Sequence, residues 1–471
     1  MSHSLDPEDW QAFRARARDM LDTLIDRMED YSDGPVWTSP DGYEPKLDTA
    51  VLGQGAVRTD QALLELMQYG VGNTHPRFLG WVHGAGTPSG LIADMLAATM
   101  NANCGGRKTG AIRIERAVID WALATFGLPE TGSGLITSGT SMATVIALKC
   151  ARDSRLGFEN RKTGHEGQGL VGYTSSHAHS CLDRAFDMLG LGGDALRKIP
   201  ATPDGRMNQD LLAEAIRCDR QAGLTPFVIC GTAGTVNRGA IDHLSDLADL
   251  CRREDIWFHV DAAFAAALQL SETHKDKLNG LSRSDSIAFD FHKWMQVNYD
   301  AGCVLIRDED SHRRTFSDRP DYLADMGRGL GSDMPWPVDY GPELSRGFRA
   351  VKIWAQLIEH GPEKLGAVVD ANIEQARYLA TQIKNTPTLE LLSYDDLNIC
   401  CFRYVGDQVE TDLDSLNQEL VIQLQESGLA APSTTRIDGK LAIRVNITNH
   451  RTQTEDMDVL LDAILRIGRR I

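Results

Sequence analysis

The stretch Ile256-Trp257-Phe258-His259-Val260-Asp261-Ala262-Ala263 decides the fold, together with Ser286-Ile287-Ala288-Phe289-Asp290-Phe291-His292-Lys293-Trp294 further along the chain. Each is an apolar run of strand length that ends on a charged residue, which predicts a short buried strand with a polar side chain at its carboxyl end. Because ligands bind at the carboxyl ends of strands in such sheets, we expect Asp261 and Lys293 to share one site.

An acid and an amine placed in this way suit one cofactor in particular. Pyridoxal phosphate needs a lysine that holds its aldehyde as a Schiff base and an acid that keeps its ring nitrogen protonated. Taken singly, an aspartate at a strand end is usually a helix cap, and a lone lysine is usually solvated. A lysine between His292 and Trp294, directly after an apolar strand, is poorly placed to be a surface charge. The local sequence therefore favours the catalytic interpretation of Asp261 and Lys293, and burial of the lysine is expected to lower its pKa.

Both motifs resemble those of the group II pyridoxal-phosphate-dependent amino-acid decarboxylases, which include the aromatic-amino-acid and glutamate decarboxylases. The residues that carry the resemblance are His259-Val260-Asp261-Ala262-Ala263-Phe264 and Phe291-His292-Lys293-Trp294, and it extends from about His75 to the end of the chain. The resemblance implies pyridoxal 5'-phosphate as the cofactor, an amino acid as the substrate and a homodimer. It also implies the type I fold of pyridoxal-phosphate-dependent transferases.

Strand and helix patterns alternate repeatedly between residues 135 and 306, which independently predicts an α/β fold with a mostly parallel sheet and helices on both faces. We expect three parts. Residues 1–70 form a helical segment, which the resemblance places on the partner subunit, whereas the pattern alone fits a helix lying on its own domain equally well. Residues 71–345 form the large cofactor-binding domain, and residues 346–471 form a small α+β domain. The proline- and glycine-rich stretch 313–342 is typical of a lid or of a disordered segment.

A candidate phosphate site follows the predicted strand 135–137. Ser138-Gly139-Thr140-Ser141 opens a helix there, so free backbone amides and hydroxyls can bind an anion, and we assign Gly139, Thr140 and Ser141 to the cofactor phosphate. The resemblance places His179 flat on the cofactor ring. It adds four further cofactor-binding residues: Thr235, Ala263, Asp290 and His292. A metal bound by His177 and His179 would need further ligands, which the sequence does not offer, so no metal is expected.

The substrate pocket is predicted from the resemblance alone. Its candidates are Trp81, His83, Asn103, Tyr340 and Arg444. A hydrogen-bonded structural histidine is the alternative for His83, and a strand arginine without a role in the site is the alternative for Arg444.

The expected reaction is decarboxylation of an L-amino acid to the corresponding amine by Lys293, Asp261 and His179. Family members carry a loop tyrosine that protonates the carbanion left by the loss of CO2. Trp336 or Pro337 falls at that position here, and the nearby Tyr322 and Tyr340 do not match. Either another group, such as Tyr340 or His179, protonates the intermediate, or the alternative is an oxygen-dependent decarboxylation–deamination that gives an aldehyde. A lyase or aminotransferase of the same fold is a further alternative.

Composition and charge indicate which binding partners and which cell compartment to expect. The net charge of −18 argues against a nucleic-acid partner, which normally requires a basic face. Nine cysteines without ligand spacing predict reduced thiols, and the polar, acidic N-terminus has no features of a signal peptide. No apolar run is long enough to span a bilayer. We therefore expect a cytoplasmic protein with no membrane partner.

Overall fold

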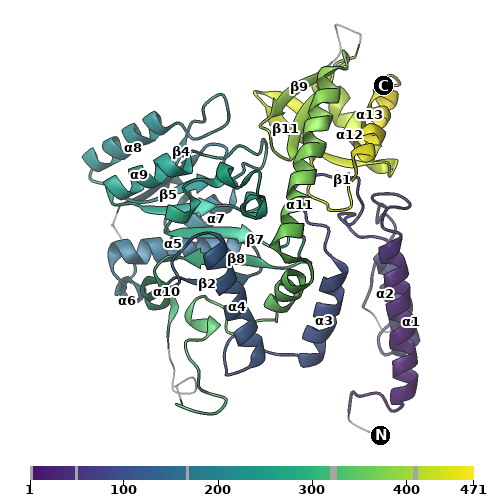
Figure 1. Ribbon diagram of the computed structural model, residues 1–471, viewed down its shortest axis with the longest axis horizontal. Coiled ribbons are helices and arrows are strands. Elements are labelled where there is room, and N and C mark those ends of the chain that lie inside the picture. The colour runs from purple at the N-terminus through teal and green to yellow at the C-terminus, as the bar shows by residue number, and fades with distance from the viewer. Residues whose placement is uncertain (1–3, 48–50, 166–168, 319–325, 407–411) are drawn as a thin grey trace.

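The computed structural model describes residues 4–47, 51–165, 169–318, 326–406 and 412–471. Two sheets organise these residues. A seven-stranded sheet has the order β2-β8-β7-β6-β5-β3-β4, and a five-stranded sheet has the order β1-β11-β12-β10-β9. Figure 1 shows the larger sheet on the left and the smaller one at the upper right, with helix α11 running between them.

The larger sheet is parallel except at β8. Its strands are β2 (Ser133–Thr137), β3 (Leu170–Ser175), β4 (Leu196–Ile199), β5 (Thr225–Thr232), β6 (Trp257–Asp261), β7 (Ser286–Asp290) and β8 (Gly302–Ile306). Strand β8 runs antiparallel to both neighbours, β2 and β7, so these two point the same way. The carboxyl ends of β2, β3, β5, β6 and β7 therefore meet along one edge, and the predicted α/β class with a mostly parallel sheet is confirmed.

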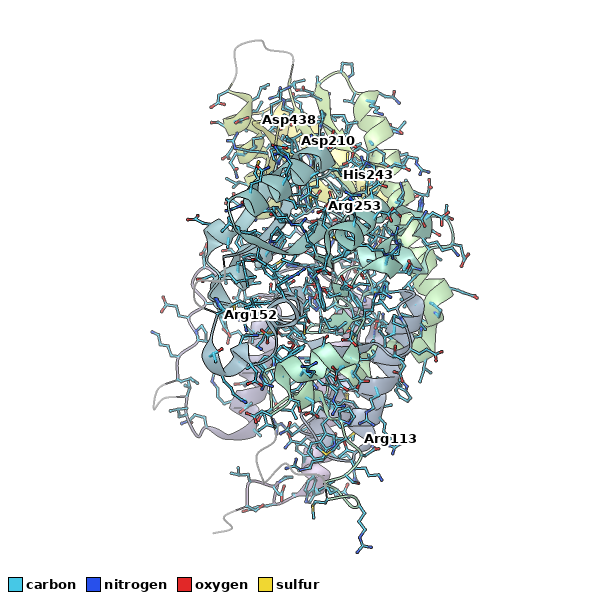
Figure 2. The ribbon with its side chains drawn as sticks, turned by 90° about the vertical axis from the view of Figure 1, so that its left-hand side faces the viewer. Arg113, Arg152, Asp210, His243, Arg253 and Asp438 are labelled. Atoms are coloured by element: carbon cyan, nitrogen blue, oxygen red, sulfur yellow. The ribbon has the colours of Figure 1, made fainter. Side chains whose placement is uncertain are left out.

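Helices cover both faces of this sheet because successive strand residues point to opposite sides. Ile287 and Phe289 pack in the core cluster with residues of α4 and α9, whereas Ala288 packs with residues of α5. The helices are α4 (Gly110–Thr125), α5 (Thr140–Leu156), α6 (Asn160–Thr163), α7 (Cys181–Met188), α8 (Gln209–Gln221), α9 (Leu244–Glu254) and α10 (Glu309–Phe316). Figure 2 shows charges of both signs on the outer side of α8 and α9, where Asp210 and Arg253 are labelled.

The smaller sheet carries the C-terminal helices. It consists of β1 (Phe78–Leu79), β9 (Leu389–Tyr394), β10 (Ile399–Tyr404), β11 (Ala431–Ile437) and β12 (Lys440–Asn446), with α12 (Leu413–Glu426) and α13 (Thr454–Gly468) packed on it. Strand β1 pairs with β11, so a segment from the N-terminal part of the chain joins this sheet. The domain boundaries 1–70, 71–345 and 346–471 stay a prediction.

Helix α11 spans Ala350–Lys384. The preceding turn is not helical because Arg346 is buried and binds Glu115 instead of facing solvent. Within α11, the backbone of Gly361 has a φ of 69° just before Pro362, so two helices meet there at a kink.

The N-terminal helices stand beside the rest of the molecule (Figure 1). They are α1 (Trp10–Glu29) and α2 (Gly55–Met67), and α3 (Pro88–Met100) follows them. Arg16 of α1 binds Asp60 of α2 at 2.6 Å, yet neither helix buries a single residue. Among the described residues, no helix has the length and apolar character needed to cross a membrane.

Candidate active site

One cavity of about 390 Å³ opens at the carboxyl edge of the larger sheet. Asp261, the last residue of β6, and Lys293, three residues after β7, both line it. Most of the other predicted site residues line it as well: Trp81, His83, Gly139, Thr140, Ser141, His179, Ala263, Asp290 and His292. The strand order brings these residues together, because each lies at or just after a carboxyl end or on a segment packed against that edge.

Asp261 is buried, with an exposed fraction of 3%. Its Oδ1 accepts a hydrogen bond from Ala263 N at 3.1 Å, and its Oδ2 accepts one from Cys181 Sγ at 3.6 Å. Burial raises the pKa of Asp261, while the charge of Lys293 opposes that rise. A cation placed against this carboxyl group would therefore be held strongly, as the ring nitrogen of pyridoxal phosphate requires.

Lys293 forms an ion pair with Asp290, whose Oδ2 lies 2.9 Å from Nζ. The other oxygen of Asp290 accepts a hydrogen bond from Thr140 N at 2.7 Å, at the start of α5. Burial lowers the pKa of Lys293, but the charge and hydrogen bond of Asp290 outweigh burial and raise it. The expectation of a lowered pKa is therefore wrong, because the carboxylate of Asp290 lies against the amine and stabilises its charged form.

His179 is oriented by its own loop. Its Nδ1 accepts a hydrogen bond from Cys181 N at 3.2 Å, which fixes the ring and leaves the proton of the neutral imidazole on Nε2. Burial lowers the pKa of His179, so the ring is neutral near pH 7. The described residues contain no group of three or more histidine, cysteine, aspartate or glutamate side chains that could hold a metal ion.

The predicted phosphate cradle surrounds the start of α5. A Cβ at Gly139 would lie 3.7 Å from both Asp290 Oδ1 and His292 Cε1, so the glycine leaves open space beside these residues. The hydroxyls of Thr140 and Thr232 line the cavity, are buried and have no hydrogen-bond partner in the described part of the chain. Buried polar groups without partners are rare, and a phosphorylated ligand would satisfy them. The residues present therefore fit pyridoxal phosphate.

Aromatic side chains form the outer wall of the cavity. Trp81, His83 and Tyr299 line it, with ring centroids 6.2 Å apart for Trp81–His83 and 6.0 Å for His83–Tyr299. Trp81 is 52% exposed and has a φ of 48°, a left-handed backbone conformation that is unfavourable for a residue other than glycine. Gly84 allows this segment to approach closely, because a Cβ there would lie 2.3 Å from Lys293 O.

Eight lining residues were not among the predicted site residues: Val82, Ser138, Cys181, Thr232, Gly234, Val236, Phe264 and Tyr299. Thr232 ends strand β5 and could have been found from its place at a carboxyl end. Cys181 follows His179 by two residues, but nothing in the sequence shows that its thiol reaches Asp261. Tyr299 lies in the loop after Lys293, and the sequence carries no signal for its position.

Two predicted residues point elsewhere. Thr235 does not line the cavity, since its hydroxyl accepts a hydrogen bond from Ala240 N at 3.1 Å within its own turn. Asn103 does not line the cavity of its own chain either. Its Oδ1 accepts hydrogen bonds from Gly105 N at 3.0 Å and Arg346 N at 3.1 Å, so it organises a loop.

Tyr340 and Arg444 also lie outside the cavity lining. The hydroxyl of Tyr340 donates to Glu309, which holds it against α10. Arg444 is 3% exposed and donates to Val236 O and Trp81 O, both at 2.8 Å. It therefore braces two segments of the cavity wall, and burial lowers its pKa to about 10.

The stretch expected to carry a family tyrosine offers none to the cavity within the described residues. Trp336 is 1% exposed and Pro337 is also buried, and neither lines the cavity. Tyr322 lies outside the described residues.

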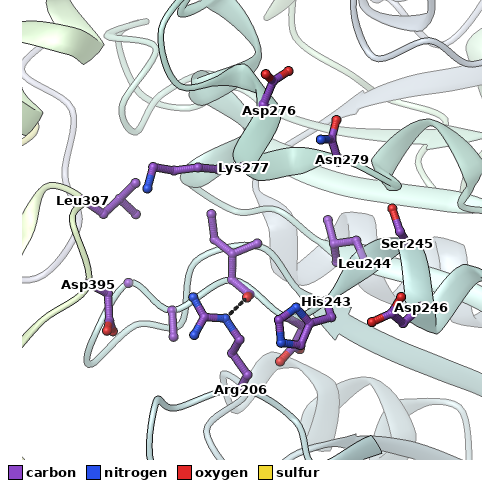
Figure 3. Close-up of a pocket in the computed structure, with 14 residues that line it drawn as sticks. Arg206, His243, Leu244, Ser245, Asp246, Asp276, Lys277, Asn279, Asp395 and Leu397 are labelled. Atoms are coloured by element: carbon purple, nitrogen blue, oxygen red, sulfur yellow. Dashed lines mark hydrogen bonds between the residues drawn. The ribbon is translucent and has the colours of Figure 1, made fainter.

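A second cavity of about 300 Å³ contains none of the predicted site residues. Figure 3 shows Arg206 at its floor, donating to Ile241 O, with His243 on one side and Asp395 on the other. Its lining contains no lysine beside a strand end, and the unpartnered hydroxyls of Thr140 and Thr232 are not part of it. The first cavity is therefore the candidate cofactor site.

A sheet edge that gathers a lysine, a buried aspartate and a small-residue phosphate cradle defines a pyridoxal-phosphate-dependent enzyme of fold type I. Residues 56–405 match the pyridoxal-dependent decarboxylase conserved domain, and the chain belongs to this family.

Relatives of full length support the same conclusion. The chain is 33% identical to an aromatic-L-amino-acid decarboxylase of Bacillus atrophaeus over 96% of this chain and 94% of that protein. It is 29% identical to a phenylacetaldehyde synthase of Arabidopsis thaliana, with 94% and 93% covered. The fold matches Oryza sativa TDC, solved with PLP and tryptamine, with a TM-score of 0.89 at 23% identity and 99% of each chain covered.

The prediction of a pyridoxal-phosphate-dependent amino-acid decarboxylase is therefore confirmed, and amine formation is favoured over the aldehyde-forming alternative.

Proposed function

We propose that this decarboxylase acts on L-amino acids with a planar aromatic side chain. The observation that carries the proposal is the aromatic wall of Trp81, His83 and Tyr299 in the same cavity as Lys293. Offset and edge-to-face contacts of such rings with a ligand ring contribute about 0.5–1.5 kcal/mol per pair beyond area burial. The relative from Bacillus atrophaeus, whose name gives aromatic L-amino acids as substrates, supports the same class.

Each site residue would have a separate role. When bound, pyridoxal phosphate supplies an electron sink for the carbon that loses CO2. Lys293 would hold its aldehyde carbon, Asp261 would face its ring nitrogen, and the neutral ring of His179 would cover one face and exclude water. At the phosphate end the contacts would come from Gly139, Thr140 and Ser141 at the start of α5, with Thr232, Ala263 and His292 nearby. Asp290 pairs with Lys293 and accepts a hydrogen bond from the amide of Thr140, so its role at the phosphate end would be to orient these two groups.

Substrate profiling tests the proposal. CO2 release is measured for each standard amino acid with the cofactor-loaded enzyme, and the products are assayed for amine, aldehyde and peroxide. We expect tryptophan, tyrosine, phenylalanine or histidine to react at least tenfold faster than acidic or aliphatic amino acids, with amine as the main product. Preference for glutamate or aspartate would contradict the substrate class. The variant Lys293→Ala serves as control, because it should lose both the aldimine absorbance band and turnover.

We further propose a cytoplasmic homodimer. Helix α1 buries none of its 20 residues and exposes Trp10, Phe13 and Ile25. Helix α3 also exposes apolar side chains, at Ile92, Met95, Leu96 and Met100. Apolar surface of this extent normally packs against a partner. Nine free cysteines support a reducing compartment. Light scattering of the eluting protein at micromolar concentration should give twice the chain mass of 51.8 kDa, and a monomer would contradict the proposal.

A further inference from the structure

Loss of CO2 from an amino acid leaves an electron pair on the α-carbon, and an amine forms only when that carbon gains a proton. The cavity must therefore contain an acid that carries a proton at neutral pH and can release it toward the substrate. This requirement rests on the proposed function. The acid groups that line the cavity differ in how well they meet it.

Most acid groups in the cavity are already engaged. Lys293 donates to Asp290, and the thiol of Cys181 donates to Asp261. Burial lowers the pKa values of His83, His179 and His292, so these imidazoles are neutral near pH 7 and are weak proton donors. Each of these groups therefore either donates its proton to another residue already or is a weak proton donor near pH 7.

Tyr299 differs from these groups. It is the one phenol that lines the cavity within the described part of the chain, and it is 46% exposed, so a ligand can reach it. Its ring lies 4.2 Å, centroid to centroid, from that of His292, the residue next to Lys293. Burial, together with the charge of Asp290, raises the pKa of Tyr299 above its ordinary value of 10, so the phenol keeps its proton across the working pH range.

The hydroxyl of Tyr299 is also uncommitted, in contrast to other tyrosines of the chain. Tyr173 donates to Asp219 at 2.9 Å, and Tyr340 donates to Glu309. The hydroxyl of Tyr299 makes no hydrogen bond to any residue that the structure describes. The second ring contact of Tyr299, edge-on to His83 at 6.0 Å, keeps the phenol at the aromatic wall where the substrate side chain would bind.

We propose that Tyr299 is a catalytic residue that delivers the proton to the carbon from which CO2 has departed. The carbon–carboxyl bond breaks and CO2 leaves without the electron pair. That pair then forms a new C–H bond with the proton of Tyr299 Oη. The resulting phenolate regains a proton from water, which the exposure of Tyr299 allows. If this proton is not delivered, dioxygen can oxidise the same carbon: one amino acid, one O2 and one water then give aldehyde, CO2, ammonia and hydrogen peroxide.

The variant Tyr299→Phe tests the proposal because it removes only the hydroxyl. The control is Tyr340→Phe, which removes a phenol that lies outside the cavity. Each protein is loaded with cofactor, and amine, aldehyde and peroxide are quantified in air with the best substrate of the wild type. In parallel, calorimetry measures binding of a reduced, unreactive phosphopyridoxyl–amino-acid conjugate to the apo-proteins, which reports folding and packing without turnover.

For Tyr299→Phe we expect amine formation to fall at least 100-fold, with aldehyde and peroxide as the larger share of what remains, and conjugate affinity within threefold of the wild type. Tyr340→Phe should retain the wild-type rate and product. Amine formation by Tyr299→Phe at the wild-type rate would overturn the proposal. A parallel loss of rate and conjugate affinity would also overturn it, since Tyr299 would then only shape the pocket. Failure of the proposed function is a separate result, in which the wild type itself releases no CO2 from aromatic amino acids.

Discussion

The buried pair of Arg346 and Glu115 should be a main determinant of stability near the phosphate cradle. Arg346 Nη2 lies 2.7 Å from Glu115 Oε1, and Nη1 lies 3.0 Å from Oε2, with side-chain exposures of 1% and 6%. The pair also holds the end of β2: Glu115 accepts from Ile136 N at 3.1 Å, and Arg346 donates to Ile136 O. Ile136 lies only three residues before Gly139, so loosening the pair should also disturb cofactor binding.

Breaking the pair on one side leaves a charge in the interior. For Arg346→Met we expect a loss of about 3–5 kcal/mol in the free energy of unfolding, because the carboxylate of Glu115 is then buried without a cation. Adding Glu115→Gln should recover about 2 kcal/mol of that loss, because the amide oxygen can still accept from Ile136 N and no charge remains buried.

Urea unfolding of the four proteins in this cycle measures both quantities. The apo-proteins are compared at one fixed concentration, because a bound cofactor or a partner subunit shifts apparent stability. Cofactor affinity is then titrated by absorbance, and Arg346→Met should bind more weakly than the double variant. A loss below about 1 kcal/mol for Arg346→Met, or a double variant no more stable than the single one, would refute the reasoning.

Three further outcomes can be measured. Asp261→Asn should keep the absorbance band that depends on Lys293 but release CO2 about 100-fold more slowly, a barrier change of about 3 kcal/mol; an unchanged rate would count against the assigned role. Gly139→Ala should fold normally, because its Cβ would meet only ordinary contacts at 3.7 Å. The same variant should bind the cofactor about tenfold more weakly. Gly302→Ala, whose Cβ would lie 2.4 Å from Gly139 Cα, should lower the urea midpoint clearly, and equal midpoints for the two variants would contradict this geometry. Burial lowers the pKa of His312 to about 3, so between pH 7 and pH 5 the unfolded chain takes up a proton that the folded chain does not. Stability should fall over that range by about 2 kcal/mol on account of this residue, and urea midpoints of His312→Gln should depend less on pH.

The parts of the fold and site that the sequence predicts are those that local patterns determine. The strands ending at Asp261 and Asp290, and the helix start at Thr140, follow from short apolar runs and small residues. Their meeting at one edge follows from the general geometry of parallel sheets.

Features that depend on distant contacts escaped prediction. Strand β11 pairs with β1, which comes from the other end of the chain, and no local pattern indicates that pairing. Arg444 and Tyr340 carry polar groups that suit a substrate, but tertiary contacts engage them elsewhere. Tyr299 had no distinguishing pattern at all, since only the packed loop after Lys293 brings its ring to the cavity.

The reversed direction of β8 has a consequence for the order in which the protein assembles. Thr137 of β2 pairs with Gly302 of β8, 165 positions later in the chain, and β2 has no other neighbour in the sheet. Closing such a long loop is slow, so β2 should be the last strand to dock. During synthesis we therefore expect the phosphate cradle that follows β2 to be completed only after residue 306 has been made.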